Sequence, residues 1–128
     1  MKAKLLETEG YALRAVIEID GRRLHVMDDM STPEEPAEPG SEFDVELLPM
    51  CLGNQTWEEM FDGNPEKKMD IEQLNEWEYM AFGKVVQVNP VVVDCGMLQV
   101  ENEIHSHDER CIGEYVAIKI DRLDAIAR

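Results

Sequence analysis

Four residues between positions 105 and 111 carry side chains that coordinate metal ions. Imidazole, carboxylate and thiolate groups are all zinc ligands, and they occur here together as His105, His107, Asp108 and Cys111. A loop between two strands could bring them together, with Cys95 as a further donor. The chain has no paired Cys-x-x-Cys motif, however, and a lone His-x-His is common. We therefore expect a solvated loop and no cofactor, and a small metal- or ligand-binding protein using loop 105–111 is the alternative.

The sequence contains no pattern typical of covalent catalysis. None of its serines lies in a Gly-x-Ser-x-Gly motif, and its glycines are scattered singly, which excludes a phosphate-binding glycine loop. A pair of Cys111 and His107 would need a third group to orient it, and the sequence offers none. We therefore expect a protein that is not an enzyme.

A second group of residues suits binding. Thr56 and Glu59 have the spacing of a helix capping box. On the short helix that follows, aromatic residues fall on one side and acids on the other, and the candidate partner-binding residues are Trp57, Glu58, Glu59, Phe61 and Asp62. Aromatic anchors beside carboxylates suit contact with a basic protein. The competing interpretation, which the pattern alone favours, is that Trp57 and Phe61 cap the open end of a barrel.

The charge of the chain limits its partners. Lys and Arg number 12 and Asp and Glu 28, which gives a net charge of −16. Residues 24–66 hold twelve of the acids and no Lys or Arg. Binding to DNA or to an anionic membrane depends on basic residues, so we expect neither as a partner. We expect a basic protein, such as a cationic enzyme that an inhibitor masks, and single-stranded nucleic acid is a further, disfavoured alternative.

The length and the apolar pattern indicate one domain in the cytoplasm. The chain has 128 residues, and compact domains most often hold about 100–150. No run approaches the ~20 apolar residues of a membrane helix, and the N-terminus lacks the apolar stretch of a signal peptide. The three cysteines Cys51, Cys95 and Cys111 are expected to be reduced, because an odd number makes no closed disulfide framework.

The first clear element is a β-hairpin. Residues 11–20 alternate, with Leu13, Ala15, Ile17 and Ile19 on the inner face. The Asp20-Gly21 pair that follows favours a two-residue turn, because both positions of such a turn need φ > 0. That turn places Ile17 opposite Leu24, Ala15 opposite Val26, and Glu18 opposite Arg23.

An acidic, Pro-rich loop is predicted for residues 30–42, followed by an alternating strand over 42–48 with Phe43, Val45 and Leu47 inward. After the helix that begins at Thr56, Asn64-Pro65 offers another helix start, and a further short helix is predicted near residues 71–77.

Strands return in the second half of the chain. They are predicted over residues 80–88, from 91 to 100 with a change of inward parity at Gly96, and over 115–121. About six strands with one or two short helices between the third and fourth predict a small, partly open β-barrel that fills residues 1–128 as a single domain. The order of elements resembles the oligosaccharide- and oligonucleotide-binding (OB) barrel, a fold that hosts many functions. An exposed strand edge could also support a homodimer.

Overall fold

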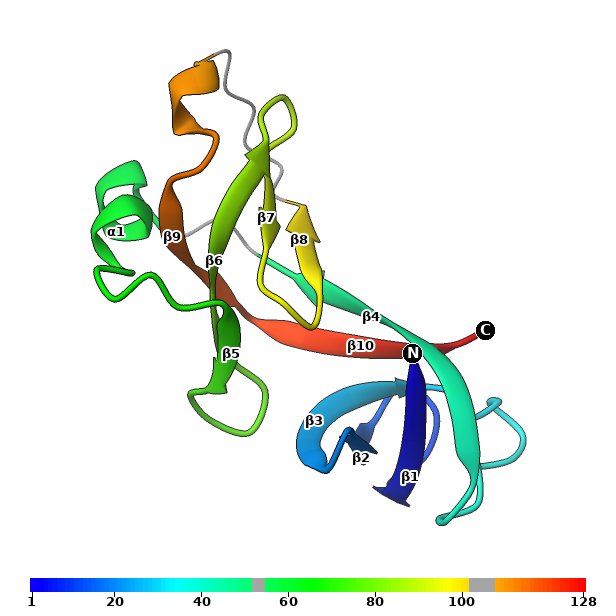
Figure 1. Ribbon diagram of the computed structural model, residues 1–128. Helices are drawn as coiled ribbons and strands as arrows, with labels where there is room; N and C mark the ends of the chain where they lie inside the picture. Colours follow the sequence, from blue (N-terminus) through cyan, green and yellow to red (C-terminus); the bar gives the residue numbers. More distant parts are fainter. Residues whose placement is uncertain (52–54, 102–107) are drawn as a thin grey trace. The chain divides into compact units, whose positions relative to one another are not determined.

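The computed structural model describes residues 1–51, 55–101 and 108–128 (Figure 1). These residues form ten strands, the helix α1 (Trp57–Asp62) and the 3₁₀ turn η1 (Glu109–Cys111). The prediction of a mostly β chain built on a small barrel is confirmed, but about six strands was too few. None of the helices in this part of the chain is long and apolar enough to span a membrane.

The chain packs as two compact units. The first contains residues 1–50 and 122–128, and the second contains residues 51–121. The second unit is therefore inserted in the sequence between the last two strands of the first. The expectation from the length, that residues 1–128 fold as a single domain, stays a prediction.

The first unit is a closed five-stranded barrel. Its strands are β1 (Lys2–Thr8), β2 (Arg14–Ile19), β3 (Arg22–Asp29), β4 (Glu42–Met50) and β10 (Arg122–Ala127). They are hydrogen-bonded in the order β1-β2-β3-β10-β4, and β4 pairs with β1 to close the barrel. Strand β10 runs parallel to β3, and the other pairs are antiparallel. The interior is filled by apolar side chains from all five strands, among them Leu5, Ile17, Leu24, Val45 and Leu123.

The predicted hairpin is confirmed residue by residue. Strands β2 and β3 pair Ile17 with Leu24, Ala15 with Val26 and Glu18 with Arg23. The turn residues Asp20 and Gly21 have φ values of 51° and 79°, as the two-residue turn requires.

The predicted start of that hairpin was wrong. Leu13 was expected inside but is 51% exposed. The chain turns at Ala12, whose φ is 62°, so the regular alternation begins only at Arg14. The carbonyl of Leu13 instead accepts a hydrogen bond from the backbone N–H of Asp28 at 2.8 Å.

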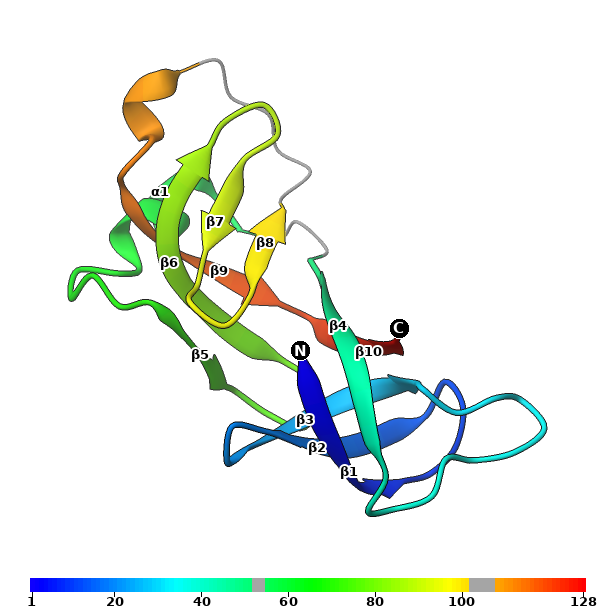
Figure 2. The same ribbon diagram turned by 45° about the vertical axis from the view of Figure 1, so that its right-hand side comes forward.

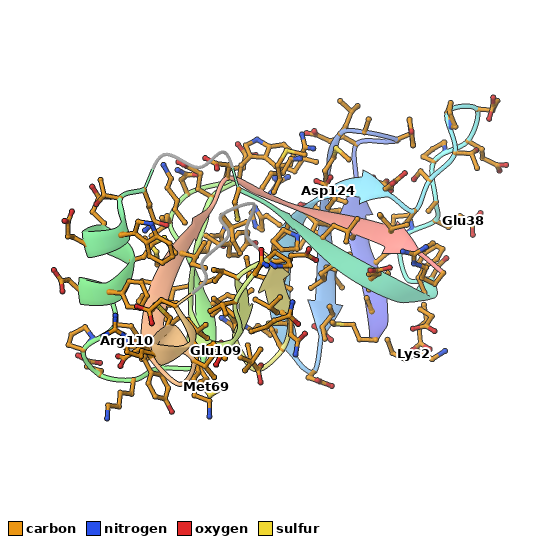
Figure 3. All side chains as sticks on the ribbon, turned by 90° about the horizontal axis from the view of Figure 1, so that it is seen from above. Lys2, Glu38, Met69, Glu109, Arg110 and Asp124 are labelled. Carbon is orange, nitrogen blue, oxygen red and sulfur yellow. The ribbon has the colours of Figure 1, made fainter. Side chains whose placement is uncertain are left out.

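The Pro-rich segment forms the predicted loop between β3 and β4 (Figure 2). Its residues 32–36 are exposed, and Figure 3 shows the side chain of Glu38 standing clear of the barrel strands. Strand β4 then alternates, with Val45 and Leu47 buried as expected, whereas Phe43, which was also expected inside, is only half-buried.

The second unit is a curled sheet around strand β6 (Tyr79–Gln87). One edge of β6 pairs with β9 (Tyr115–Ile120), and its other partners are β5 (Asp70–Gln73) and β7 (Val92–Asp94), which continues to β8 (Gln99–Glu101). The helix predicted near residues 71–77 was therefore wrong. Ile71 is buried opposite Ala81 in a β pair, and pairing with β6 decides its conformation.

The parity change at Gly96 is confirmed. Val93 and Cys95 are buried before it, and Leu98 and Val100 are buried after it. The cause is a tight connection between β7 and β8, in which Gly96 has a φ of 89°. In β6 the buried residues are Tyr79, Ala81, Gly83 and Val85, whereas the neighbouring Val86 is exposed.

Candidate functional site

Helix α1 begins where the capping pattern predicts. Thr56 is its N-cap, and the Thr56 hydroxyl accepts a hydrogen bond from the backbone N–H of Glu59 at 3.2 Å. The helix lies beside β9 (Figure 1) and ends at Gly63. It turns Met60, which is 1% exposed, into the core of the second unit.

The aromatic residues of α1 form a stacked pair at the surface. The ring centroids of Trp57 and Phe61 are 5.4 Å apart, with an interplanar angle of 25°. Trp57 keeps 39% of its surface exposed, whereas Phe61 is half-buried. The residue of α1 that fills the core is thus Met60, and Trp57 stays open to contact from outside.

Three carboxylates lie on the same helix as this pair. Glu58, Glu59 and Asp62 are exposed, and within the described part of the chain they form no ion pair. The last turn of α1 contains no basic residue, and a negative charge near a helix C-terminus is unfavourable. Asp62 therefore adds nothing to the stability of the helix. We call Trp57, Glu58, Glu59, Phe61 and Asp62 the α1 surface.

Two side-chain amides hold α1 against β9, one on each side of the helix. Gln55 precedes it: its Nε2 donates to the carbonyl of Ala117 at 3.1 Å, and its Oε1 accepts from the N–H of Lys119 at 2.7 Å. Asn64 follows it: its Nδ2 donates to the carbonyl of Val116 at 3.2 Å. Gln55 thus bonds the edge of β9 that faces away from β6, as a neighbouring strand would.

Asn64 is also tied to its own loop. Its Oδ1 accepts from the N–H of Lys68 at 2.8 Å, and its Nδ2 donates to the Lys68 carbonyl at 3.0 Å. The buried Asn64 side chain therefore links its own loop to β9. The helix start expected at Asn64-Pro65 was wrong. Sequence reasoning missed the role of both amides, because nothing local signals a polar side chain that bonds a strand some fifty or sixty residues away.

We expect Gln55→Ala to lower the free energy of unfolding by about 1–2 kcal/mol, because two hydrogen bonds to β9 are lost. Urea denaturation measures this loss. Gln73→Ala is the matched control: Gln73 is exposed and its side chain makes one hydrogen bond, to the carbonyl of Asn75, so its cost should stay within about 0.5 kcal/mol. Equal losses of unfolding free energy in the two variants would contradict the role of Gln55 in holding α1 on β9.

The barrel of the first unit carries a hollow of about 340 Å³ on its outer face. A bulge in β1 shapes one side of it: Leu5 pairs with Ile17 and Glu7 pairs with Val16, so that Leu6 is an extra residue. We call this the arginine hollow, and its lining residues are Leu6, Glu7, Arg14, Val16, Arg23 and His25.

A buried carboxylate, Asp28, holds the start of the Pro-rich loop against the barrel. Asp28 is fully buried, and its Oδ1 accepts the N–H groups of Met30 and Ser31, both at 2.8 Å. Its Oδ2 accepts the hydroxyls of Ser31, at 2.6 Å, and of Thr8. Burial alone would raise the pKa of Asp28, but these hydroxyl and backbone donors together lower it below its usual value. The arrangement anchors the loop and leaves no proton to transfer near neutral pH.

Part of the predicted zinc group has a structural role. Asp108 caps η1, and it accepts bonds from the backbone N–H of Arg110 at 3.0 Å and from its guanidinium at 2.8 Å. These bonds lower the pKa of Asp108. Figure 3 labels Arg110 beside Glu109 in this turn. Cys111 is half-buried.

The remaining zinc candidates are a core residue and two undescribed ones. Cys95 is buried, and this burial raises the pKa of its thiol to about 12. No three His, Cys, Asp or Glu side chains gather as a metal site within residues 1–51, 55–101 and 108–128. His105 and His107 lie outside the described residues, so the zinc alternative stays a prediction.

Comparison with known proteins adds no relative. The chain matches no protein family, no curated protein and no solved structure.

Proposed function

We propose that this chain is a non-enzymatic, acidic binding module whose α1 surface takes a basic segment of a protein partner. One observation carries the proposal: the exposed ring of Trp57 is stacked on Phe61 among carboxylates that no cation of the described residues neutralises. Trp is the residue type most often found as an energetic anchor of protein interfaces.

The chemistry of the partner follows from these groups. A Lys or Arg of the partner can lie over the face of Trp57 and also pair with Glu58 or Asp62. The net charge of −16 steers a cationic protein towards the chain and repels polyanions. Binding of this kind weakens as salt rises, because exposed charges are screened.

The hydrogen bonds that hold α1 on β9 favour a role of the α1 surface in binding. Gln55 and Asn64 hold the two ends of the helix on β9, so the aromatic pair is already in place before a partner arrives. A preordered surface loses less conformational entropy on binding than a flexible one does.

Three finer statements belong to the same proposal. The barrel is OB-like, as its strand order and the parallel pair of β3 and β10 support, and such barrels host many functions. The protein acts in the cytoplasm. A homodimer through a strand edge remains an alternative partner, although Gln55 occupies the outer edge of β9 at Ala117 and Lys119.

The test removes three charges at the α1 surface and, separately, three elsewhere. Immobilised wild-type protein is compared with the Glu58→Gln/Glu59→Gln/Asp62→Asn variant in capturing proteins from native lysate at low salt and at ~0.5 M salt. The matched control, Glu34→Gln/Glu35→Gln/Glu38→Gln, removes the same charge from exposed residues of the Pro-rich loop.

We expect a basic protein that wild type and control retain and that the α1 variant binds about tenfold more weakly, since each exposed charge contributes roughly 0.5 kcal/mol. The same protein should elute at high salt. Equal weakening in both triple variants would reduce the effect to net charge and contradict the α1 surface. Retention unchanged in the α1 variant would contradict it as well.

A further inference from the structure

The connection between β1 and β2 exposes three consecutive apolar residues at one end of the barrel. Tyr11 is 45% exposed and Leu13 is 51% exposed, and Ala12 between them is exposed as well. A run of exposed apolar residues is unfavourable in water unless it serves a function. We call residues 11–13 the apolar turn, and we consider it a candidate for contact with another molecule.

Hydrogen bonds fix the backbone of the apolar turn. The N–H of Ala12 donates to the carbonyl of Asp28 at 2.8 Å, and the N–H of Asp28 donates to the carbonyl of Leu13 at 2.8 Å. The N–H of Leu13 donates to the carbonyl of Gly10 at 3.1 Å, and the N–H of Gly10 donates to the Thr8 hydroxyl at 3.0 Å. Because backbone and hydroxyl groups hold the turn, its exposed side chains are not needed to keep its shape.

Ala12 adopts a backbone conformation that favours glycine. Its φ is 62°, in the left-handed region where a Cβ is crowded by the backbone. Asp28 imposes this conformation through its two bonds to the turn, and Asp28 is itself held by Thr8 and Ser31. Strained residues of this kind persist where the surrounding structure imposes them, and they gather at functional sites. The apolar turn is therefore ordered before a partner arrives, and binding costs it little conformational entropy.

Acids surround the apolar turn. Asp28 anchors the Pro-rich loop at the same end of the barrel, so that the acids of this loop accompany the turn. The exposed acids at this end are Glu9, Glu34, Glu35 and Glu38. Within the described part of the chain none of these four forms an ion pair, and Figure 3 shows the Glu38 side chain pointing away from the strands. This end of the barrel therefore combines an apolar tip with a negative surround.

We propose that the apolar turn inserts Tyr11 and Leu13 into an apolar pocket of a protein partner, and that Lys and Arg side chains rim this pocket. Tyr is among the residue types that most often anchor protein interfaces, and a basic rim complements the acids around the turn. A second copy of this chain is a poor partner, because the same acids would face one another. The turn belongs to the first unit and the α1 surface to the second, so either proposal can fail without the other.

Photo-crosslinking identifies what covers the turn. The photoreactive amino acid p-benzoylphenylalanine is placed at Tyr11 of the full chain and, as the matched control, at Leu48, which is 40% exposed on β4 of the same unit. Irradiation in native lysate at low salt should join the probe at Tyr11, and not the probe at Leu48, to a basic protein. The yield should fall at ~0.5 M salt, because the charges of the rim are screened.

The crosslinked protein is then purified and titrated with variants of the chain. Tyr11→Ser and Leu13→Ser should each weaken binding about tenfold, whereas Leu13→Met, which keeps the apolar volume, should change the affinity less than about threefold. Leu48→Ser should change it less than about twofold. The urea midpoints of Tyr11→Ser and Leu13→Ser should match that of the wild type, because both side chains are exposed.

Three results would overturn the proposal. The first is a probe at Tyr11 that joins to an acidic protein, a second copy, a lipid or nothing. The second is an affinity that Tyr11→Ser and Leu13→Ser leave unchanged or that Leu48→Ser lowers equally. The third is a fall of the urea midpoint in Tyr11→Ser and Leu13→Ser, which would give these side chains a structural role instead.

Discussion

Gly83→Ala is expected to lower the free energy of unfolding by about 3 kcal/mol, because the added methyl group has no room between two paired strands. A Cβ at Gly83 would collide with the backbone carbonyl oxygen of Asp94, and it would lie 2.8 Å from the carbonyl carbon and 2.9 Å from Cγ1 of Val93. These atoms belong to β7, where Lys84 pairs with Asp94. A backbone cannot move aside as the end of a flexible side chain can, so the strands must separate.

The matched control is Gly113→Ala in the same unit. A Cβ at Gly113 meets nothing within 4 Å, and the cost comes only from its φ of 94°, about 1 kcal/mol. Urea denaturation measures both variants. A loss at Gly83 no larger than the loss at Gly113 would contradict the close approach of β6 and β7. Gly83 also pairs with Val116 of β9, and the Val116 carbonyl accepts a hydrogen bond from Asn64 beside α1. If the α1 surface binds the basic partner proposed above, the Gly83 variant should therefore bind it more weakly.

Asp28→Ala should cost a similar amount, about 3 kcal/mol, because it leaves several donors without their acceptor. The carboxylate of Asp28 accepts two backbone N–H groups and the hydroxyls of Ser31 and Thr8, all at the base of the Pro-rich loop. Ser31 in turn fixes the middle of the loop, because its Oγ accepts a hydrogen bond from the N–H of Ala37 at 2.8 Å. The matched control is Asp29→Ala, which removes the neighbouring acid of β3 and should cost less than about 1 kcal/mol.

The contribution of Asp28 depends on pH in a defined direction. The pKa of Asp28 is lowered from its ordinary value of 3.8, so the native protein favours the ionised form more strongly than the unfolded chain does. The stabilisation is fully present above that value and is lost as pH falls through the lower native pKa. The difference in unfolding free energy between wild type and Asp28→Ala should therefore be constant from pH 5 to 7 and shrink below about pH 3.8. A difference that grows towards acid would contradict this role.

Local sequence information predicted the elements whose residues interact with near neighbours. A two-residue turn at Asp20-Gly21 allows only one pairing register of the flanking strands, and β2 and β3 pair in that register. The capping pair of Thr56 and Glu59 marked the start of α1, and alternation marked Val45 and Leu47 as buried positions of β4. In each of these elements the signal comes from residues within one turn or one hairpin.

Prediction failed where a distant segment decides the conformation. Residues 70–73 follow a possible helix start, but pairing with β6 makes them a strand. Leu13 continues an apolar alternation, but the contact of residues 12 and 13 with Asp28 turns the chain. Gln55 and Asn64 are unremarkable polar residues until β9 lies beside them.

The sequence by itself determined that this protein is acidic and mostly β, and that it contains a short helix with aromatic and acidic residues. Charge and short-range periodicity are properties of neighbouring residues, and they are readable without a structure. Tertiary structure alone decided that β10 closes the barrel between β3 and β4, that Trp57 stays exposed while Met60 is buried, and that a bulge in β1 opens a hollow next to Arg14. These features depend on which distant segments pair, and such pairing is set by the packing of the whole chain rather than by any local stretch of it.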